Sequence, residues 1–477
     1  MTTLLATTGL RARTGGYAAE PVDLDALYAA ATSMQIVPTD GAPDAPKMHT
    51  VYGVDSDDLA QAGWAVVFPQ DEHSAAIREA LAPLLELRRR QAGPRYRECF
   101  GRDGIARGES KRAFLARHGV GAGPVDPALF PYYVLLVGDP ERVDFAFQYL
   151  LDVNYAVGRL DFALDDGTPD IAAYGAYAHR VAMQETEGTH ATEHRNAHAD
   201  AASILFFGPC SPDDAATELS SHELIRPLGE RLRTRTDRPV DVLLGSEATK
   251  GALDRRLRSD PPALLFSAGH GLVFESGDPQ QRPHQGALVC SDWPGPEEWQ
   301  APIPETFYYS RDDLSSEPGV DFDGMSAFLF ACFGLGTPRH NEFATRGASG
   351  PTRNAQRPFT SQLPQAMLRR GASAVIGHVD LAWDYSFRTD RKEQQLQAFE
   401  SVLRRLADGG TFGAAMEDFN TRAAALAMEL VVERDHARFT RSDLVDRASL
   451  VALWTAYLDA RNYVVLGDPA VRLRGGI

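Results

Sequence analysis

The chain has 477 residues, of which 44% are hydrophobic and 24% charged, and this is the composition of a globular protein large enough to bury a sizeable core. A formal net charge of −17 argues against a nucleic-acid binder that rests on a basic surface, and no stretch approaches the roughly 18 apolar residues of a membrane span. The four cysteines are widely spaced without a CxxC pair, which excludes a disulfide scaffold and a zinc knuckle.

The first part of the chain divides into an arm and a small subdomain. Residues 1–60 lack sustained hydrophobic periodicity, so we expect an N-terminal arm or irregular cap. A first α/β subdomain with a linker is predicted over 61–200, where apolar runs and amphipathic stretches alternate as they do around a mainly parallel sheet. Its predicted strands are 64–68, 132–137 and 155–160, and its predicted helical stretches are 74–90, with a kink at Pro83, and 169 to about 200.

A second, larger subdomain is predicted over 201–477, with the same alternation. Its predicted strands are 203–208, 240–244, 263–268, 327–331, 374–377 and 463–466, and its predicted helices are 362–370, 391–407 and 412–432. The segment 273–322 is rich in Pro, Gly, Asp and Glu and is longer than most connections. We therefore expect a regulatory or autoprocessed loop there.

Two of these strands end at a reactive side chain. The run 263–268 leads to His270, which stands between two glycines, and the run 327–331 leads directly to Cys332. Open α/β sheets place their sites at the carboxyl ends of strands. A thiol and an imidazole on neighbouring strand ends would form a nucleophile and its acid/base.

Each motif alone also has a plainer interpretation. Free cysteines are among the most buried residues, so Cys332, like Cys99, Cys210 and Cys290, is also compatible with a place in the core. His270 is also compatible with a turn histidine whose hydrogen bonds are satisfied. The two motifs together favour chemistry, because both follow apolar strands of one apparent sheet.

Five segments, in their order along the chain, resemble the gingipain-type cysteine peptidases, which are relatives of caspases, legumain, separase and the CHAT-domain peptidases. The segments are 133–139, 157–160, the histidine motif 269–271, the cysteine motif 331–332 and the closing segment 466–469. The resemblance covers about residues 60–477. It implies an α/β fold, the three-layer α/β/α caspase-hemoglobinase fold, with a mainly parallel sheet, a smaller first subdomain and a larger catalytic one.

By this resemblance Cys332 is the nucleophile and His270 the general acid/base of a cysteine endopeptidase that forms a thioester acyl-enzyme. In this family the two side chains often face the scissile bond from opposite sides, so no hydrogen bond between them is required. The amides of Gly271 and Cys332 are the expected oxyanion donors. Trp383 stands where the family carries a pocket-lining tryptophan, and packing is the other explanation for a tryptophan at a strand end.

Acidic residues are candidates for the substrate pocket, since members of the family that cut after arginine hold its side chain with an acid. The candidates are Asp213, Asp214, Glu218, Asp380 and Asp384. Surface carboxylates are common in so acidic a chain, so for each acid taken singly a solvated surface charge is favoured over a functional role. A basic P1 residue is the preference that they suggest. A third catalytic acid is left open, because Pro209 and Cys210 stand near its position in the family.

Other motifs favour simpler roles. His190, His194 and His198 would share a helix face, but without an HExxH motif a solvated or capping role is preferred to a zinc site. The Gly-Asp-Pro turns lack the glycine spacing of a phosphate loop, and the serine-hydrolase motif GxSxG is absent. We therefore expect neither a metal nor another cofactor.

The sequence thus predicts a cysteine endopeptidase. A cytoplasmic location is expected, because the amino terminus lacks the basic start and long apolar run of a secretion signal. The expected partners are a protein or peptide substrate and an activator or regulatory protein, with no nucleic acid and no membrane. Two alternatives stay open: a caspase-like scaffold or sensor with little turnover that acts by partner binding, and a hydrolase of another thioester or amide substrate that uses the same dyad.

Overall fold

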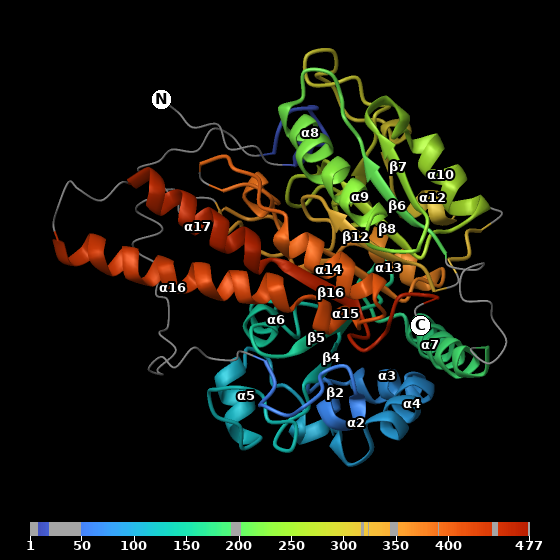
Figure 1. Cartoon of the computed structure of the whole chain (residues 1–477), viewed down its shortest axis with the longest axis vertical. Coiled ribbons are helices and arrows are strands. Elements are labelled where there is room, and N and C mark those ends of the chain that lie inside the picture. The colour runs from blue at the N-terminus through green and yellow to red at the C-terminus, as the bar shows by residue number, and fades with distance from the viewer. Residues whose placement is uncertain are drawn as a thin grey trace.

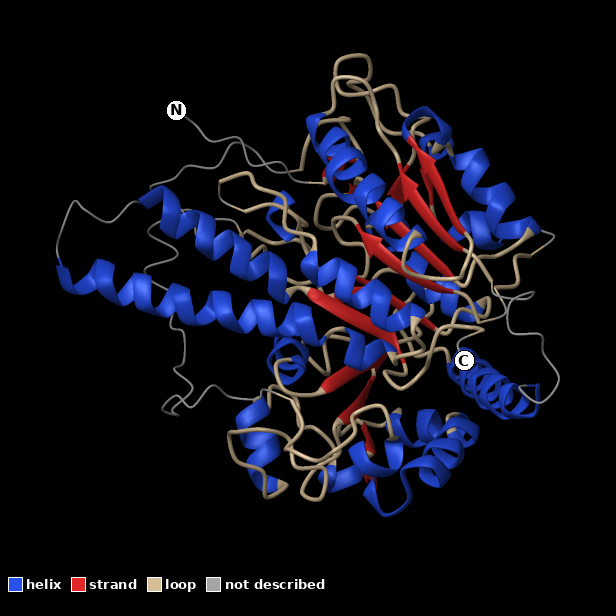
Figure 2. Cartoon of the chain, in the orientation of Figure 1, coloured by secondary structure: helices blue, strands red, loops and turns tan. Residues whose placement is uncertain are grey.

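The computed structural model describes residues 8–18, 49–191, 202–315, 319–322, 324–343, 352–389, 391–440 and 447–475, except for the side chains of 187–191 and 437–440. Its centre is a ten-stranded sheet with helices packed on both sides of it (Figures 1 and 2). In sheet order the strands are β3 (Tyr96–Cys99), β2 (Trp64–Val67), β4 (Tyr133–Val137), β5 (Ala156–Leu160), β16 (Tyr463–Gly467), β15 (Ala374–His378), β12 (Ser326–Phe330), β8 (Leu264–Ala268), β6 (Ile204–Gly208) and β7 (Val240–Leu244).

The sheet is mainly parallel. Neighbouring strands from β3 to β5 run parallel, as do those from β15 to β7, and β15 and β16 are antiparallel. Every residue of β4, β8, β12 and β15 is buried. Strands covered by helices on both faces have no polar side, which is why they stand in the sequence as short, continuous apolar runs. The predicted α/β fold, with helices on both faces of a mainly parallel sheet, is confirmed.

The helices account for most of the chain between the strands. In chain order they are α2 (Leu59–Ala62), α3 (Ser74–Ala80), α4 (Ala82–Ala92), α5 (Lys111–Arg117), α6 (Phe145–Asp152), α7 (Ile171–Ala191), α8 (Ala215–Leu219), α9 (Arg226–Arg233), α10 (Lys250–Ser259), α11 (Gln281–His284), α12 (Arg311–Ser315), α13 (Gln362–Arg369), α14 (Gln397–Ala407), α15 (Phe412–Ala415), α16 (Glu417–Thr440) and α17 (Arg447–Arg461). The predicted helix 74–90 is interrupted at Leu81, and Pro83 lies in the first turn of α4, where its missing N–H leaves no hydrogen bond unmade.

The end of the chain ties the two halves of the sheet together. β16 inserts between β5 and β15, so strands from 61–200 and from 201–477 belong to one sheet. Just after β16, the Asp468 carboxylate accepts from Trp64 Nε1 at 3.0 Å and from Arg88 Nε at 2.6 Å. The division into units 1–60, 61–200 and 201–477 remains a prediction. In the described ranges, no helix is both long enough and apolar enough to cross a membrane.

A smaller four-stranded sheet involves both the N-terminal segment and part of 273–322. Its order is β1 (Gly9–Arg11), β9 (Gly271–Val273), β10 (Leu288–Val289) and β11 (Tyr308–Tyr309). It has its own apolar core, in which Leu10 and Ala12 pack with residues such as Leu272 and Trp293. Strands of two or three residues are too short to show a hydrophobic period, and none of them was predicted. A regulatory role for 273–322 stays a prediction.

Candidate active site

His270 and Cys332 lie at the ends of two adjacent strands. β8 and β12 pair in parallel, with Ala268 opposite Phe330. Each reactive residue follows its strand by two positions, so the register brings both to the same level at the edge of the sheet. The Gly269 amide donates to the Phe330 carbonyl at 3.2 Å, which joins the two strand ends just below the reactive residues.

The chain after His270 passes against the backbone of Cys332. A Cβ atom at Gly271 would lie 2.0 Å from the Cys332 carbonyl oxygen, a distance that no side chain tolerates. Only glycine therefore fits at this position. The close approach keeps the histidine and cysteine motifs in contact.

A buried carboxylate holds the imidazole of His270. Nε2 of the ring lies 2.9 Å from Oδ2 of Asp214, and both side chains are fully buried. The Asp214 carboxylate also accepts from the hydroxyl of Thr217 and, at 2.8 Å, from that of Tyr17. Because Nε2 is occupied, Nδ1 is the ring nitrogen left for chemistry, and it has no hydrogen-bond partner within the described part of the chain.

The same contacts set the charge of the pair. Burial lowers the pKa of His270, but the charge of Asp214, its hydrogen bond and the Thr8 carbonyl outweigh burial, and the net effect raises that pKa. Burial likewise opposes the ionised form of Asp214, yet His270, Thr217 and Tyr17 together lower the pKa of Asp214 to about 2. The pair therefore favours a carboxylate beside an imidazolium, which has a proton to give.

The sulfur of Cys332 is covered by two backbone segments. The Ala382 amide donates to Sγ at 3.1 Å, and Thr8 Oγ1 lies 3.6 Å from Sγ. The sulfur also lies 3.7 Å from the Ala382 carbonyl oxygen. The thiolate is the reactive form of cysteine. The exposed fraction is 0% for Cys332 and 1% for His270, so both reactive side chains are closed off from solvent in this conformation.

The Gly271 amide is directed at a carbonyl oxygen beside the thiol. It donates to the Thr8 carbonyl at 2.8 Å, and the Thr8 amide in turn donates to the Ala382 carbonyl at 3.2 Å. A donor in this position is what an oxyanion would require. The other expected donor, the amide of Cys332, stays a prediction.

Backbone strain gathers around the site. Among the described residues other than glycine, positive φ occurs at Asp213 (57°), Phe333 (55°), Asp380 (73°) and Lys392 (63°). The first precedes Asp214, the second follows Cys332, and the third lies two residues after β15. The Phe333 amide also donates to the Asp380 carbonyl at 2.7 Å. Such conformations cost roughly 1–3 kcal/mol each and persist where the surrounding structure enforces them, commonly at functional sites.

The predicted pocket acids have different surroundings. Asp213 and Glu218 are exposed, whereas Asp214 is bound to His270. Asp380 is fully buried. Its Oδ1 accepts from Asn354 Nδ2 at 3.0 Å and from the Leu381 amide at 2.9 Å, while its Oδ2 has no hydrogen-bond partner in the described residues. Burial is the main cause that raises the pKa of Asp380 to about 7.

Trp383 and Asp384 lie in the loop that follows β15. Trp383 is buried, with its ring 5.5 Å from that of Phe343, and its indole N–H has no hydrogen-bond partner in the described residues. Its backbone amide donates to Asp459 Oδ1 at 2.9 Å. Asp384 is half-buried, and burial is the largest of the influences that raise its pKa to about 6. Both residues lie on the same loop as Ala382, which contacts Sγ.

Sequence reasoning missed Thr8, Tyr17 and Asp459. Thr8 and Tyr17 come from a segment without periodicity, so no local signal marks them. Asp459 stands in α17, which was not predicted, and its carboxylate also accepts from Ser386 Oγ. It therefore fixes the loop that carries Trp383.

Metal ligation has little support in the described part of the chain. No group of three or more His, Cys, Asp or Glu residues there could hold a metal ion. His194 and His198 lie outside the described residues, as does the side chain of His190. The predicted histidine stripe is thus not described.

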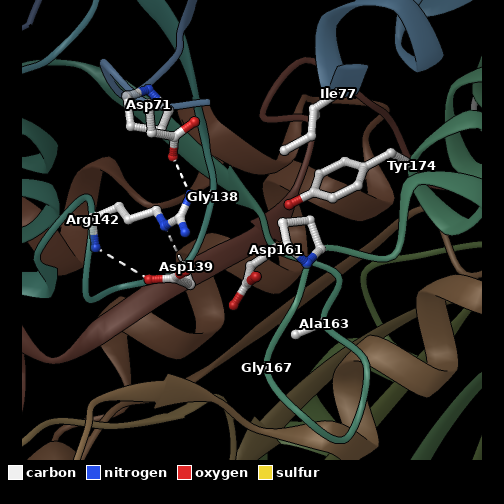
Figure 3. A pocket seen from close by; sticks show the side chains of 11 residues that line it. Asp71, Ile77, Gly138, Asp139, Arg142, Asp161, Ala163, Gly167 and Tyr174 are labelled. Carbon is white, nitrogen blue, oxygen red and sulfur yellow. Dashed lines mark hydrogen bonds and ion pairs between the residues drawn. The ribbon is translucent and has the colours of Figure 1, made fainter. Parts of the chain in front are cut away.

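A second polar cluster lies at the strand ends of the first half of the sheet. Asp71, Asp139, Arg142 and Asp161 line a cavity of about 10 Å³ (Figure 3). Arg142 forms an ion pair with Asp71 and another, of 3.3 Å, with Asp139. Burial is the largest cause that raises the pKa of Asp161 to about 6. A cavity of this size has room for about one water molecule, so it offers no place for a substrate.

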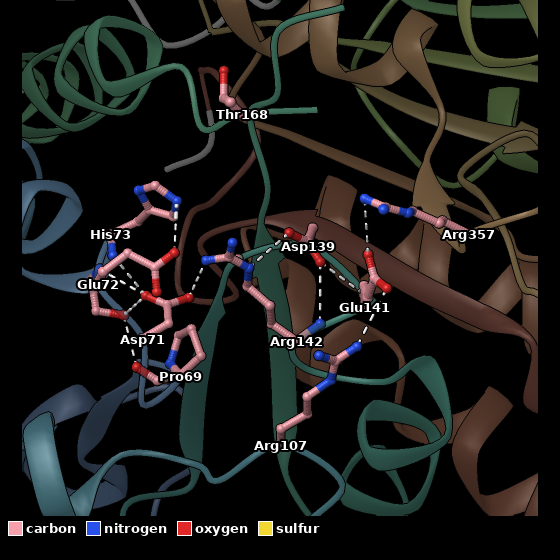
Figure 4. Close-up of polar contacts among 12 residues, drawn as sticks. Pro69, Asp71, Glu72, His73, Arg107, Asp139, Glu141, Arg142, Thr168 and Arg357 are labelled. Atoms are coloured by element: carbon pink, nitrogen blue, oxygen red, sulfur yellow. Dashed lines mark hydrogen bonds and ion pairs between the residues drawn. The ribbon is translucent and has the colours of Figure 1, made fainter. Parts of the chain in front are cut away.

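Figure 4 shows how this cluster continues to Glu141. That carboxylate pairs with Arg107 at 3.3 Å and with Arg357 at 3.8 Å. Arg357 belongs to the connection that follows the cysteine motif, so these ion pairs join the first half of the sheet to the second. These ion pairs therefore support a structural role for the cluster, which is to hold the two halves of the sheet together.

Comparisons with known proteins give a likeness of fold. No protein-family model matches the chain, and no curated protein matches its sequence. The complex of Porphyromonas gingivalis RgpB pro- and mature domains is 13% identical, with a TM-score of 0.45, over 87% of this chain and 80% of that chain. The Arg-specific cysteine proteinase gingipain R (RgpB) is 12% identical, with a TM-score of 0.47, over 87% of this chain and 79% of that chain. Likeness at this level assigns no residue, and the function is argued from the site itself.

Proposed function

We propose that this protein is a cysteine peptidase of the gingipain type, built on the caspase-hemoglobinase fold, with Cys332 as nucleophile and His270 as general acid/base. The observation that carries the proposal is the position of the Thr8 carbonyl. The Gly271 amide donates to its oxygen at 2.8 Å, and the Thr8 side chain lies 3.6 Å from Sγ. This peptide group supports the proposal, because it contacts the residues to which we assign the nucleophile and the oxyanion donor.

The proposed reaction has two steps. The Cys332 thiolate attacks the carbonyl carbon of the bound peptide, and the Gly271 amide stabilises the oxyanion. Nδ1 of the His270 imidazolium protonates the leaving nitrogen as the C–N bond breaks. The neutral imidazole then deprotonates a water molecule, which attacks the thioester and restores the thiolate and the imidazolium. The new carboxylic acid gives its proton to the released amine and becomes a carboxylate.

Asp214 is proposed as a positioning residue. The sequence makes Asp214 a candidate pocket acid, but its contacts support action through the imidazole. Its 2.9 Å contact with Nε2 fixes the ring and leaves Nδ1 for the proposed proton transfer, and its charge favours the protonated ring. Thr217 and Tyr17 hold the carboxylate in turn.

A basic P1 residue is proposed for peptide substrates. Asp380 supports this proposal most, because one of its buried oxygens has no hydrogen-bond partner in the described residues. An ammonium or guanidinium group of a substrate could supply that hydrogen bond. Trp383, from the same loop, would pack on the aliphatic part of such a side chain, and Asp384 would add charge. Asp213 and Glu218 are exposed and give weaker support for a role in binding the P1 side chain.

The proposal is tested by hydrolysis of a fluorogenic peptide-amide library varied at P1. We expect wild-type turnover with one preferred P1 class, lost in Cys332→Ala and in His270→Ala. Cys290→Ala is the matched control, because Cys290 is also buried, and it should retain wild-type turnover. Turnover that persists unchanged in Cys332→Ala would overturn the assignment of the nucleophile.

A second candidate is the scaffold or sensor with little turnover. The observation that favours it is the closed site, with exposed fractions of 0% for Cys332 and 1% for His270. A scaffold has no need of a reactive thiol. It would leave peptides intact even when the cover over Cys332 is displaced, whereas the peptidase would then become active.

A further inference from the structure

Helices α5 and α6 bring an amine and a side-chain amide together beside the first half of the sheet. Lys111 is the first residue of α5, and its Nζ donates to Asn154 Oδ1 at 2.6 Å and to the Leu150 carbonyl at 2.6 Å. Leu150 belongs to α6, and Asn154 to the turn that leads from α6 to β5. The two hydrogen bonds hold the amine of Lys111 directly against the carboxamide of Asn154.

The packing of the two helices fixes this contact. Phe114 lies three residues after Lys111, on the same face of α5. Its buried ring packs edge-on against the buried ring of Phe147 in α6, with 5.6 Å between the ring centres (Figure 1). The Asn154 backbone amide donates to the Leu151 carbonyl at 3.1 Å, which fixes the turn. The amine and the carboxamide therefore come from two ordered elements, and groups held together in this way react faster than free ones.

A buried carboxyl group belongs to the same cluster. Asp152, the last residue of α6, is 8% exposed, and its Oδ2 has no hydrogen-bond partner in the described residues. Burial raises the pKa of Asp152 well above its ordinary range, and the charges of Arg159 and Lys111 offset this only in part. Burial also lowers the pKa of Lys111 to about 8, against the opposing charge of Asp152. Both shifts favour an uncharged acid beside an uncharged amine, which is the nucleophilic form of lysine.

We propose that Lys111 and Asn154 join in an intramolecular isopeptide bond, a modification that is independent of the proposed peptidase function. Nζ of Lys111 bonds to Cγ of Asn154, the Cγ–Nδ2 bond breaks, and ammonia leaves. One proton passes from Nζ to Nδ2 through the Asp152 carboxyl group, which is unchanged at the end. The reaction consumes no other molecule, so the folded chain is sufficient for it.

The bond closes a covalent loop in the first half of the molecule. Its two residues are 43 positions apart, and β4 lies between them in the chain. Like a disulfide, such a cross-link restricts the unfolded chain and thereby favours the folded state. The cross-linked protein should therefore unfold at a higher temperature than a variant that lacks the bond.

The test is intact-mass measurement and peptide mapping of the full-length protein under denaturing conditions. We expect a chain that has lost one ammonia, and a branched peptide that joins Lys111 to Asn154. Lys111→Arg and Asn154→Ala should show neither. Lys250→Arg is the matched control and should keep the bond, because Nζ of Lys250 binds the Glu305 carbonyl and the Asp313 carboxylate, each at 2.7 Å, in place of a side-chain amide. A wild-type chain without the branched peptide, or with a branch at another pair of residues only, would overturn the inference.

Further variants separate the chemistry from an effect on folding. Asn154→Asp replaces the carboxamide by a carboxyl group, so the same branched peptide should form with loss of water in place of ammonia. Asp152→Asn removes the proton carrier, and we expect the branched peptide to appear at least about tenfold more slowly after cell-free synthesis. Asp161→Asn, at another buried acid, is the control and should form the bond at the wild-type rate. Equal rates for these last two variants would contradict the proton transfer through Asp152.

Discussion

Two clusters at strand ends of the same sheet use polar side chains differently. After β2 and β4, Arg142 sits between the carboxylates of Asp71 and Asp139, so each of these three charges faces an opposite one. After β8 and β12, the imidazole of His270 has a partner on one nitrogen and none on the other within the described residues. The charges of Arg142, Asp71 and Asp139 are thus satisfied by one another. The imidazole keeps a ring nitrogen that could still bind a further group.

The difference shows why only one cluster is a candidate for chemistry. Paired charges around a cavity of about 10 Å³ lose interactions if anything enters. The His270 ring, whose Nδ1 has no partner in the described residues, and the thiol that accepts from the Ala382 amide would gain interactions in the proposed reaction. The comparison predicts that substitutions in the second cluster change activity, and that those in the first change stability.

The largest effect is expected for Cys332→Ala. Loss of the nucleophile removes the covalent path, so kcat/KM should fall by at least about 10⁴-fold. Cys99→Ala, another buried cysteine, should leave kcat/KM within about twofold, because its sulfur lies at a distant strand end. Peptide hydrolysis measured on both variants checks this. An equal loss in the two would mean that the effect comes from packing.

Asp214→Asn should lower kcat/KM by about 10²- to 10⁴-fold, since the ring loses the charge that orients and protonates it. With the carboxylate gone, burial remains and lowers the pKa of His270. The activity that depends on the imidazolium is lost as pH rises through that pKa, so the alkaline limb of the kcat/KM profile should move to lower pH. A pH–rate profile measures this shift.

The adjacent acid supplies the control for Asp214. Asp213 is exposed and has positive φ, a conformation that asparagine also adopts. Asp213→Asn should therefore leave the profile unchanged. A shift of the same size in both variants would point to the net charge of the loop as the cause.

The length of each element, and how far along the chain its partner lies, decide how much of the fold and of the candidate site could be predicted from the sequence. β8, β12 and the other long strands were predicted, because five consecutive buried residues leave a clear apolar run. β1 was not, because a strand of three residues exists only through its pairing with β9, far along the chain. Likewise, nothing in the sequence distinguishes Asp213 from Asp214 as the partner of His270. The turn at Asp213 decides which carboxylate meets His270.

Tyr17→Phe should have a smaller effect, a loss of about three- to tenfold in kcat/KM. The variant removes one hydrogen bond of 2.8 Å to the Asp214 carboxylate, and a hydrogen bond to a charged group contributes about 1.5–3 kcal/mol before the other contacts adjust. Thr217 and His270 still hold that carboxylate. Tyr52→Phe is the control, because that ring is 91% exposed. Peptide hydrolysis by the two variants separates a role at Asp214 from a general effect of losing a hydroxyl.

Arg142→Gln should have the smallest effect on activity, within about twofold, and should lower the free energy of unfolding by about 1–2 kcal/mol. The guanidinium bridges Asp71 and Asp139, and its removal leaves two carboxylates facing each other with no cation between them. Arg107→Gln is the matched control, since that side chain is 76% exposed and its pair with Glu141 should contribute little. Denaturant unfolding and peptide hydrolysis are measured on both. A large loss of activity in Arg142→Gln at unchanged stability would mean that the first cluster takes part in catalysis. It would contradict the contrast drawn between the two strand-end regions.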